Sequence, residues 1–289
     1  MPLRVAAISF LNPAPLLFHF EHEPYASGLR EHYSVSYTSP AQCAAQLQAG
    51  TADLGLIPIA SLTPALAIVP GCTIASLHEV RSILLLVKNP GGLTVDDALR
   101  GVTTIAADAA SRSSNAYAHI LFEHFLDTHP AFVEQPADPG VMLGGADAAL
   151  LIGDPALLAR EHRAEIEAAA GPCLWLDVAQ LWRQHTGLPW VAAVWAVRPE
   201  ALTPENISAQ QLIADLNTSR DAGLAHTDQL VNEWTPRLAL PAKTIRTYLT
   251  HNIHYTLDDD CVKAIQLFRR LAAETNILPP IELNILASR

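Results

Sequence analysis

The 289-residue sequence lacks any hydrophobic run long enough to cross a membrane. A spanning helix needs roughly 18–20 consecutive apolar residues, and no segment comes near that length. The first 12 residues also lack the long apolar core and the small-residue cleavage site of a signal peptide. Pro13 and Pro15 would interrupt a helix there. We therefore predict a cytoplasmic protein whose first segment is a strand.

Cysteine is scarce, and its placement excludes the usual paired motifs. The chain has four cysteines, far apart in sequence, and no C-x-x-C pair. This pattern is typical of small buried side chains in a reducing compartment. Spacing alone leaves a disulfide open, although nothing in the sequence favours one. The four are Cys43, Cys72, Cys173 and Cys261.

Positive charge is also in short supply. The chain has 18 Lys and Arg against 29 Asp and Glu, a formal net charge of −11. Nucleic acid and acidic membrane surfaces are therefore poor partners for the chain as a whole. A protein of this charge that binds an anion must do so locally, with helix starts, hydroxyl groups and a few placed cations.

Several motifs of cofactor chemistry are missing. The sequence contains no G-x-G-x-x-G and no G-x-x-x-x-G-K-[ST], so nothing supports a nucleotide cofactor. It has no G-x-S-x-G, which leaves a nucleophilic serine without support. Two histidine pairs with i, i+3 spacing, His19/His22 and His251/His254, have neither an H-E-x-x-H arrangement nor a third ligand nearby in sequence. We predict no metal and no organic cofactor.

The chain contains an alternation of strand-like and helix-like segments. Hydrophobic residues make up 50% of it, enough for a large core. Strands alternating with helices at this spacing predict an α/β fold with a largely parallel sheet. The expected strands are residues 4–10, 34–37, 52–61, 82–87 and 102–105, and the expected early helices begin near residues 16, 40, 95 and 111.

One segment of the chain is repeated. Residues 50–62 and 145–157 each contain a glycine, an Ala-Asp pair, an apolar strand and a loop with proline. Each follows a strand–loop–helix unit, at residues 4–21 and 102–126. Two similar α/β lobes in series predict a ligand cleft between them.

The expected lobe limits follow from the two continuous strand-like runs. Lobe I is expected to comprise residues 1–88 plus 198–289, and lobe II residues 89–197, because the chain can cross between lobes near 88–92 and 190–197. Beyond residue 198 the pattern is helical, and these helices are expected to pack on lobe I. They are residues 204–221, 227–235, 241–249 and 258–275.

A polar loop at residues 108–115 is the first candidate binding site. It follows a strand and opens a helix, and Ser111, Ser113 and Ser114 are residue types that cap helix starts. A helix start offers free N–H groups and a dipole worth roughly 0.3–1 kcal/mol to one anion. With Arg112 added, the loop suits a carboxylate or phosphate. The alternative is an ordinary capped helix whose arginine faces water.

Other polar residues follow strands directly. In open α/β sheets, ligands bind beyond the carboxyl ends of the strands. Asn12 follows the first strand, and Gly153 and Asp154 follow the strand of the second repeat. Ser82 opens an apolar strand. As an alternative to ligand binding, Asn12 would cap its own turn and Ser82 would face solvent.

Six short motifs, taken together and in order, resemble the chorismate dehydratase family of the futalosine route to menaquinone. Each motif alone is weak, but the resemblance runs along nearly the whole chain, including the tail at residues 248–255. The motifs are ISFLN at 8–12 with Pro15, DLGLIP at 53–58, VRSILLL at 80–86, SRSS at 111–114, LIGDPA at 151–156 and TGLP at 186–189.

The resemblance implies a two-lobed fold like that of type II periplasmic binding proteins. It implies an enzyme that removes water from chorismate to give 3-[(1-carboxyvinyl)oxy]benzoate, without a metal or organic cofactor. By the same resemblance Asn12 is a catalytic residue, and Ser82 and residues 111–114 bind substrate carboxylates. Phe10 and Pro13 stand where the family more often has a tyrosine and a small polar residue. The resemblance therefore does not define the shape of the first loop.

The chemistry of chorismate indicates what such a site must do. Its two carboxylates must be held while a ring proton and a hydroxyl leave, and the ring becomes aromatic. We expect the helix start after residue 111 to hold one carboxylate, with Gly153 also at the substrate. Asn12 would hydrogen-bond the departing hydroxyl or orient the enol ether side chain. Two candidates for the general base stay open, Asp154 and the substrate's own enolpyruvyl carboxylate.

Two alternatives remain beside this function. The sister family, 1,4-dihydroxy-6-naphthoate synthase, carries a histidine and a glutamate near the second-lobe crossover, where this chain has residues 152–155 and a glycine at Gly153. A non-catalytic cytosolic solute-binding protein would share the fold without the chemistry. The sequence does not assign an oligomeric state.

Overall fold

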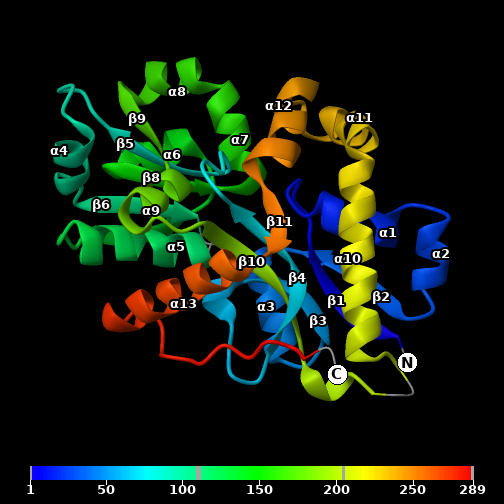
Figure 1. Ribbon diagram of the computed structural model, residues 1–289. Coiled ribbons are helices and arrows are strands. Elements are labelled where there is room, and N and C mark those ends of the chain that lie inside the picture. The colour runs from blue at the N-terminus through cyan, green and yellow to red at the C-terminus, as the bar shows by residue number, and fades with distance from the viewer. Residues whose placement is uncertain (1, 109–111, 204–205, 288–289) are drawn as a thin grey trace.

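Two β-sheets, each flanked by helices, form the framework of the molecule (Figure 1). The computed structural model describes residues 2–108, 112–203 and 206–287. The order of the six-stranded sheet is β11 (His254–Leu257), β4 (Ala67–Ser76), β10 (Trp190–Val197), β3 (Leu54–Pro58), β1 (Leu3–Ile8), β2 (Tyr33–Thr38). That of the five-stranded sheet is β7 (Ala131–Gln135), β6 (Thr104–Asp108), β8 (Ala148–Ile152), β5 (Ile83–Lys88), β9 (Cys173–Asp177).

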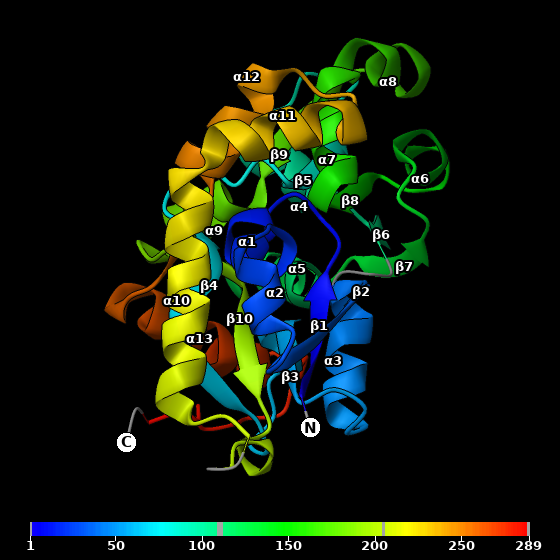
Figure 2. The same cartoon turned by 90° about the vertical axis from the view of Figure 1, so that its right-hand side faces the viewer.

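The helices divide between the two sheets and a C-terminal group (Figures 1 and 2). Near the six-stranded sheet lie the 3-10 turns η1 (Ala14–Leu17) and η2 (Ile59–Ser61), with α1 (Phe18–Glu21), α2 (Tyr25–Leu29) and α3 (Pro40–Gln48). Around the five-stranded sheet lie α4 (Val95–Arg100), α5 (Arg112–His119) with its π-helical extension η3 (Ile120–Phe125), α6 (Pro139–Gly145), α7 (Gly153–Glu161), α8 (Arg163–Ala170) and α9 (Val178–Thr186). The C-terminal group is η4 (Pro199–Ala201), α10 (Ala209–Ala225), α11 (Thr227–Leu238), α12 (Ala242–Thr247), the π-helical η5 (Tyr248–Asn252) and α13 (Asp259–Glu274).

Local sequence accounts for the central strands and for several helix starts. All residues of β3 and β8, and all but the last of β5, are buried, as expected for apolar strands covered on both faces. Ser39 and Gln42 form a capping box at α3. At α4 the Thr94 hydroxyl accepts from the Asp97 N–H and donates to the Asp97 carboxylate, which confirms Thr94 as the N-cap.

The sheet topology confirms the repeat expected from the sequence. Strands β2-β1-β3-β10-β4 match β7-β6-β8-β5-β9 in order, and the first three strands of each set run parallel. In each set the next strand, β10 or β5, is antiparallel to its neighbour. The repeated segments 50–62 and 145–157 contain β3 and β8, which occupy the equivalent place.

Two strands lie in the sheets opposite to those expected. Strand β5, expected in lobe I, pairs with β8 and β9, whereas β10, expected in lobe II, pairs with β3 and β4. By sheet membership the chain therefore crosses between lobes at residues 77–82 and 178–189, rather than at 88–92 and 190–197. The physical reason is that an apolar run fits the centre of either sheet, so hydrophobicity does not identify its partner.

The C-terminal group packs largely as expected. Helix α10 lies against η1, α1 and β4, and α13 contacts both β10 and α5. Four strands were not expected: β4, β7 and β9, and also β11, which adds to the edge of β4 as a short antiparallel strand. Among the described residues, no helix is both long and apolar enough to cross a membrane. All four cysteines are buried and unpaired, which confirms their expected role as core residues.

The close approach of α10 to η1 depends on Gly223. A Cβ at this position would overlap the backbone of Pro15. We predict that Gly223→Ala destabilises the protein by about 1–3 kcal/mol, because overpacking outweighs the better helix propensity of alanine. The measurement is the urea midpoint. Gly28→Ala in α2 is the control, since no atom lies within 4 Å of its Cβ position; equal effects of the two substitutions would refute the packing argument.

Candidate active site

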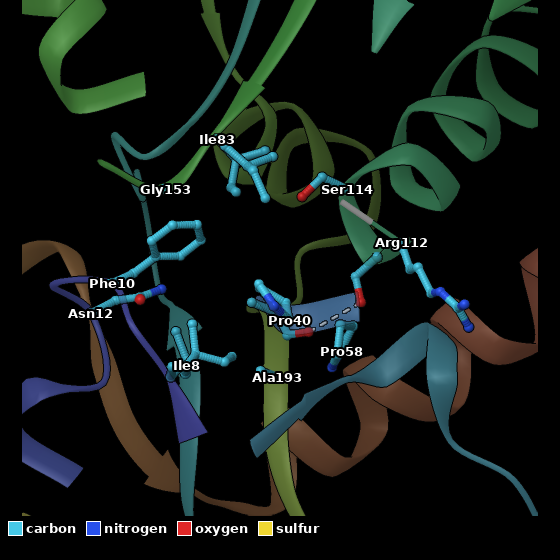
Figure 3. A pocket seen from close by; sticks show the side chains of 14 residues that line it. Ile8, Phe10, Asn12, Pro40, Pro58, Ile83, Arg112, Ser114, Gly153 and Ala193 are labelled. Atoms are coloured by element: carbon cyan, nitrogen blue, oxygen red, sulfur yellow. Dashed lines mark hydrogen bonds between the residues drawn. The ribbon is translucent and has the colours of Figure 1, made fainter. Parts of the chain in front are cut away.

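A cavity lies between the two sheets, and residues from both form its walls (Figure 3). The room that it leaves for the centre of a water-sized molecule is about 50 Å³, and it is in part open to solvent. Its walls come from the loop after β1, the ends of β3 and β8, and the starts of β5 and α5. The lining residues are Ile8, Phe10, Asn12, Pro40, Pro58, Ile74, Ile83, Arg112, Ser113, Ser114, Ile152, Gly153, Ala192 and Ala193.

Asn12 offers this cavity an unused hydrogen-bonding atom. Its Oδ1 is buried and has no hydrogen-bond partner among the described residues. Figure 3 shows its side chain beside Phe10 at one side of the cavity. A buried polar atom without a partner is costly, so a ligand group that donates to it gains the full value of the bond. The structure thus places Asn12 at the cavity, and its catalytic role stays a prediction.

The two described serines of the α5 start differ in availability. The Ser113 hydroxyl donates to the Ala192 carbonyl at 3.1 Å and accepts from the Ala60 N–H at 3.2 Å. It therefore joins α5 to the other sheet. The Ser114 hydroxyl has no recorded hydrogen bond in the described chain, and Figure 3 shows it turned toward Ile83 across the cavity. Ser111, the third predicted serine, lies outside the described residues.

Arg112 supplies a cation at the edge of the cavity. Its side chain is exposed, and within the described part of the chain it has no ion pair and no hydrogen bond. Figure 3 shows it leaving the start of α5 away from Phe10 and Asn12. A guanidinium at a helix start has the charge that an anion site needs, and the role of Arg112 in such a site stays a prediction. The same exposure leaves the alternative of a solvent-facing arginine in place.

Gly153 makes a tight contact between the lobes. Its φ of +62° is in the left-handed region that favours glycine, and a Cβ there would lie 2.9 Å from the Phe10 ring. Its N–H donates to the Ser82 carbonyl at 2.7 Å. Position 153 therefore accepts no side chain unless Phe10 moves.

Asp154 lies behind the cavity rather than in its wall. Its Oδ1 accepts from the Leu11 N–H at 3.1 Å, and only 8% of the residue is exposed. Burial raises the pKa of this carboxyl to about 6, although the Leu11 bond opposes the rise. Asp154 thus holds the loop that carries Asn12. Both the base role and this supporting role remain compatible with its chemistry.

Ser82 also lies behind the lining. It is 1% exposed, and its Oγ accepts from the Tyr248 hydroxyl at 2.8 Å. The next residue, Ile83, lines the cavity. The sequence-based set therefore gathers around one place, but Ser82 and Asp154 are not among its lining residues.

Two functional candidates were missed in the sequence. Phe10 forms a wall of the cavity, and its place beside Asn12 was a usable signal. Tyr248 is separated by 166 residues from Ser82, so no local pattern pointed to their contact.

One group of side chains has the composition of a metal site. His254, Asp258 and Cys261 bring their ligand atoms within 4.8 Å of one another at the corner between β11 and α13. Asp258 is already the N-cap of α13, accepting from the Cys261 N–H, and His254 Nε2 lies 2.8 Å from its other oxygen. Helix capping and a hydrogen bond between His254 and Asp258 account for this group. His251, which forms the i, i+3 pair with His254 in the sequence, is instead hydrogen-bonded to Thr250.

Comparison with solved structures confirms the expected fold. The protein AF1704 from Archaeoglobus fulgidus aligns with a TM-score of 0.71 at 15% identity, covering 96% of this chain and 98% of that one. The periplasmic aliphatic sulphonate binding protein SsuA from Escherichia coli aligns with a TM-score of 0.64 at 16% identity, covering 100% and 94%. At these identities the likeness establishes a two-lobed binding-protein-like fold.

Comparison of sequences identifies the family. A chorismate dehydratase from Thermus thermophilus is 27% identical over 262 residues, which are 86% of this chain and 88% of the relative. A family model described as menaquinone biosynthesis matches residues 3–274. Because this match covers nearly the whole chain, the protein belongs to the menaquinone biosynthesis family.

Proposed function

We propose that the protein is a chorismate dehydratase, which eliminates water from chorismate to form 3-[(1-carboxyvinyl)oxy]benzoate in the futalosine route. The observation that carries this proposal is the cavity between the lobes, where the unpartnered Oδ1 of Asn12 shares one space with the Ser114 hydroxyl. Arg112 lies at its edge, and within the described ranges of the chain this cation forms no ion pair. The 27% identical relative of that name supports the same reaction.

The start of α5 is the proposed carboxylate site. Arg112 and the free Ser114 hydroxyl flank the first turn of this helix, whose N–H groups and dipole favour negative charge. Ser113 acts indirectly, since its hydroxyl already joins α5 to Ala60 and Ala192. In a chain of net charge −11, such local groups supply the attraction for a dicarboxylate.

Asn12 is the proposed catalytic residue at the leaving hydroxyl. Its Oδ1 accepts a hydrogen bond, and the Nδ2 of the same amide can donate one to an oxygen that gains negative charge as it departs. Gly153 lines the same cavity, with the Phe10 ring packed directly against it. Loss of water aromatises the ring, so the reaction is favourable and the site need only lower its barrier.

The geometry favours the substrate's enolpyruvyl carboxylate as the base over Asp154. The Asp154 carboxylate lies outside the lining and is engaged by the Leu11 N–H. A base needs hydrogen-bond reach of the proton that it removes. We therefore assign Asp154 the task of holding the Asn12 loop, with direct proton removal as the alternative that the tests below distinguish.

The sister reaction, 1,4-dihydroxy-6-naphthoate synthesis, fits the site less well. The histidine associated with that family would fall near Gly153, where a Cβ would meet the Phe10 ring. A non-catalytic solute-binding protein fits the fold as well as the enzyme does, and turnover alone separates the two. A cytoplasmic location stays a prediction.

The test is turnover of chorismate by the purified protein after treatment with a chelator. We expect a product lighter by one water, with the ultraviolet absorbance of an aromatic ring. Tight binding without a product would indicate a ligand sensor. Absence of both would direct the assay to the naphthoate-forming reaction.

Asn12→Ala tests the role at the leaving hydroxyl. We expect kcat to fall about 10²-fold while KM changes only a few-fold, because the lost interaction is made mainly in the transition state. Steady-state kinetics provide the measurement, with the exposed Asn232→Ala on α11 as control. A rise in KM at constant kcat would make Asn12 a binding residue only.

Asp154→Asn separates the two roles of Asp154. The amide oxygen still accepts from Leu11, so we expect kcat within about tenfold of the wild-type value and no drop in wild-type kcat as pH falls through about 6. A base acts only when ionised. If Asp154 were the base, kcat would fall below pH 6 and would be nearly lost in the variant.

A further inference from the structure

We propose that Tyr248 is the positioning residue that aims the Ser82 hydroxyl at the substrate. The proposal rests on the proposed function and on the expectation, implied by the family resemblance, that Ser82 binds a substrate carboxylate. The two side chains meet through a hydrogen bond of 2.8 Å between Tyr248 Oη and Ser82 Oγ. Each residue is only 1% exposed, so water does not compete for this contact.

The chemistry of the pair sets the direction of the bond. Burial raises the pKa of the Tyr248 phenol well above its ordinary value, so the phenol stays neutral and keeps its proton. A phenol is a stronger acid than an aliphatic alcohol, so Tyr248 donates and Ser82 Oγ accepts. The hydroxyl proton of Ser82 is then left without a recorded acceptor in the described chain. It remains available for a carboxylate oxygen of the ligand.

Ser82 is connected directly to the cavity wall. Its carbonyl accepts from the Gly153 N–H at 2.7 Å, and Gly153 lines the cavity, as does Ile83, the residue after Ser82. A hydroxyl fixed at this point lies next to the surface that a ligand meets.

The element that carries Tyr248 is fastened to the same crossover segment. Tyr248 opens the π-helical turn η5, which ends with the Ile253 N–H bonded to the Tyr248 carbonyl. From the same turn, Asn252 Nδ2 donates to the Glu79 carbonyl at 3.2 Å. The turn therefore holds residues 79–82 at two points. Single π-helical turns recur at functional sites, because they displace one side chain from the helical register.

Tyr248 thus joins two parts of the chain that different lobes supply. Strand β11, which follows η5, belongs to the six-stranded sheet, whereas β5, which follows Ser82, belongs to the five-stranded sheet. The bond is made only when the lobes have this mutual arrangement. Ser82 is consequently oriented in the same arrangement that forms the cavity.

A double-mutant cycle on kcat/KM tests the proposal. Tyr248→Phe removes only the hydroxyl, and we expect it to lower kcat/KM about tenfold, mostly through KM, as for one lost hydrogen bond to a charged ligand. In the Ser82→Ala background the same substitution should change kcat/KM less than about twofold, because its target is gone. Thermal denaturation of each variant accompanies the kinetics.

Two control variants separate orientation from support. Asn252→Ala removes the other hydrogen bond between η5 and residues 79–82 without changing Ser82. It should lower the melting temperature and leave kcat/KM nearly unchanged. Tyr33→Phe removes a buried tyrosine bond of similar length, 2.7 Å to Asp215, in strand β2. It should leave the kinetics unchanged. If Asn252→Ala lowers kcat/KM as much as Tyr248→Phe does, mere support of the segment explains the effect and the proposal is overturned.

The remaining outcomes are equally decisive. Unchanged kinetics in Tyr248→Phe, or an undiminished effect in the Ser82→Ala background, overturns the positioning role while leaving the dehydratase function intact. No product from the wild-type protein overturns the function, and this proposal with it. Should Tyr248→Phe fail to fold, 3-fluorotyrosine at position 248 keeps the ring and makes the phenol a stronger donor. Its kcat/KM should be no lower than that of the wild type, and a loss would contradict the proposal.

Discussion

The contact between the loop after β1 and the start of α7 is the constraint on which the rest of the site depends. Here the Phe10 ring packs on Gly153, and the Leu11 N–H binds the Asp154 carboxylate across the lobes. The glycine conformation permits the ring contact, while the buried carboxylate satisfies an N–H that strand β1 no longer pairs. Because Asn12 follows Leu11 directly, the same contact places its amide at the cavity.

Three further hydrogen bonds between the lobes reinforce that contact. Ser113 bonds to both Ala60 and Ala192 from the start of α5, and Tyr248 bonds to Ser82. Behind Ala60, the buried Arg269 of α13 donates to its carbonyl at 3.1 Å. The polar groups between the sheets thus have two tasks. Some hold the lobes in their mutual arrangement, and others, namely Asn12 Oδ1, Ser114 Oγ and the Arg112 guanidinium, have no hydrogen-bond partner among the described residues.

The sequence predicted local elements better than partnerships between them. The apolar strands, the capped helices and the repeat follow from short-range periodicity and cap residues, and the structure confirms them. The exchange of β5 and β10 between sheets does not follow, because both runs are apolar on both faces and fit either centre. Strand β11 was missed for a related reason, since its four residues pair only at the edge of β4.

The same distinction between local pattern and long-range contact applies to the residues of the site. Residues at strand ends and helix starts were identified because topology alone brings such positions to one edge of a sheet. Which of them face the cavity depends on long-range contacts. Ser113 has the right residue type in the right place, yet its hydroxyl is used to join lobes. No local pattern connected Tyr248 with Ser82, because the two residues lie 166 positions apart in the sequence.

The net negative charge of the molecule means that attraction for an anionic ligand must come from a few groups inside the cavity. A dicarboxylate approaching a chain of net charge −11 meets general repulsion, so attraction must come from within the cavity. The cavity wall is largely apolar, and electrostatic and hydrogen-bond interactions are stronger where water is excluded. In the proposed dehydratase, recognition rests on a helix start, one guanidinium and two or three neutral polar side chains. Neutral donors and acceptors also suit an elimination in which the base can come from the substrate itself, since they orient the reacting groups without competing for the proton.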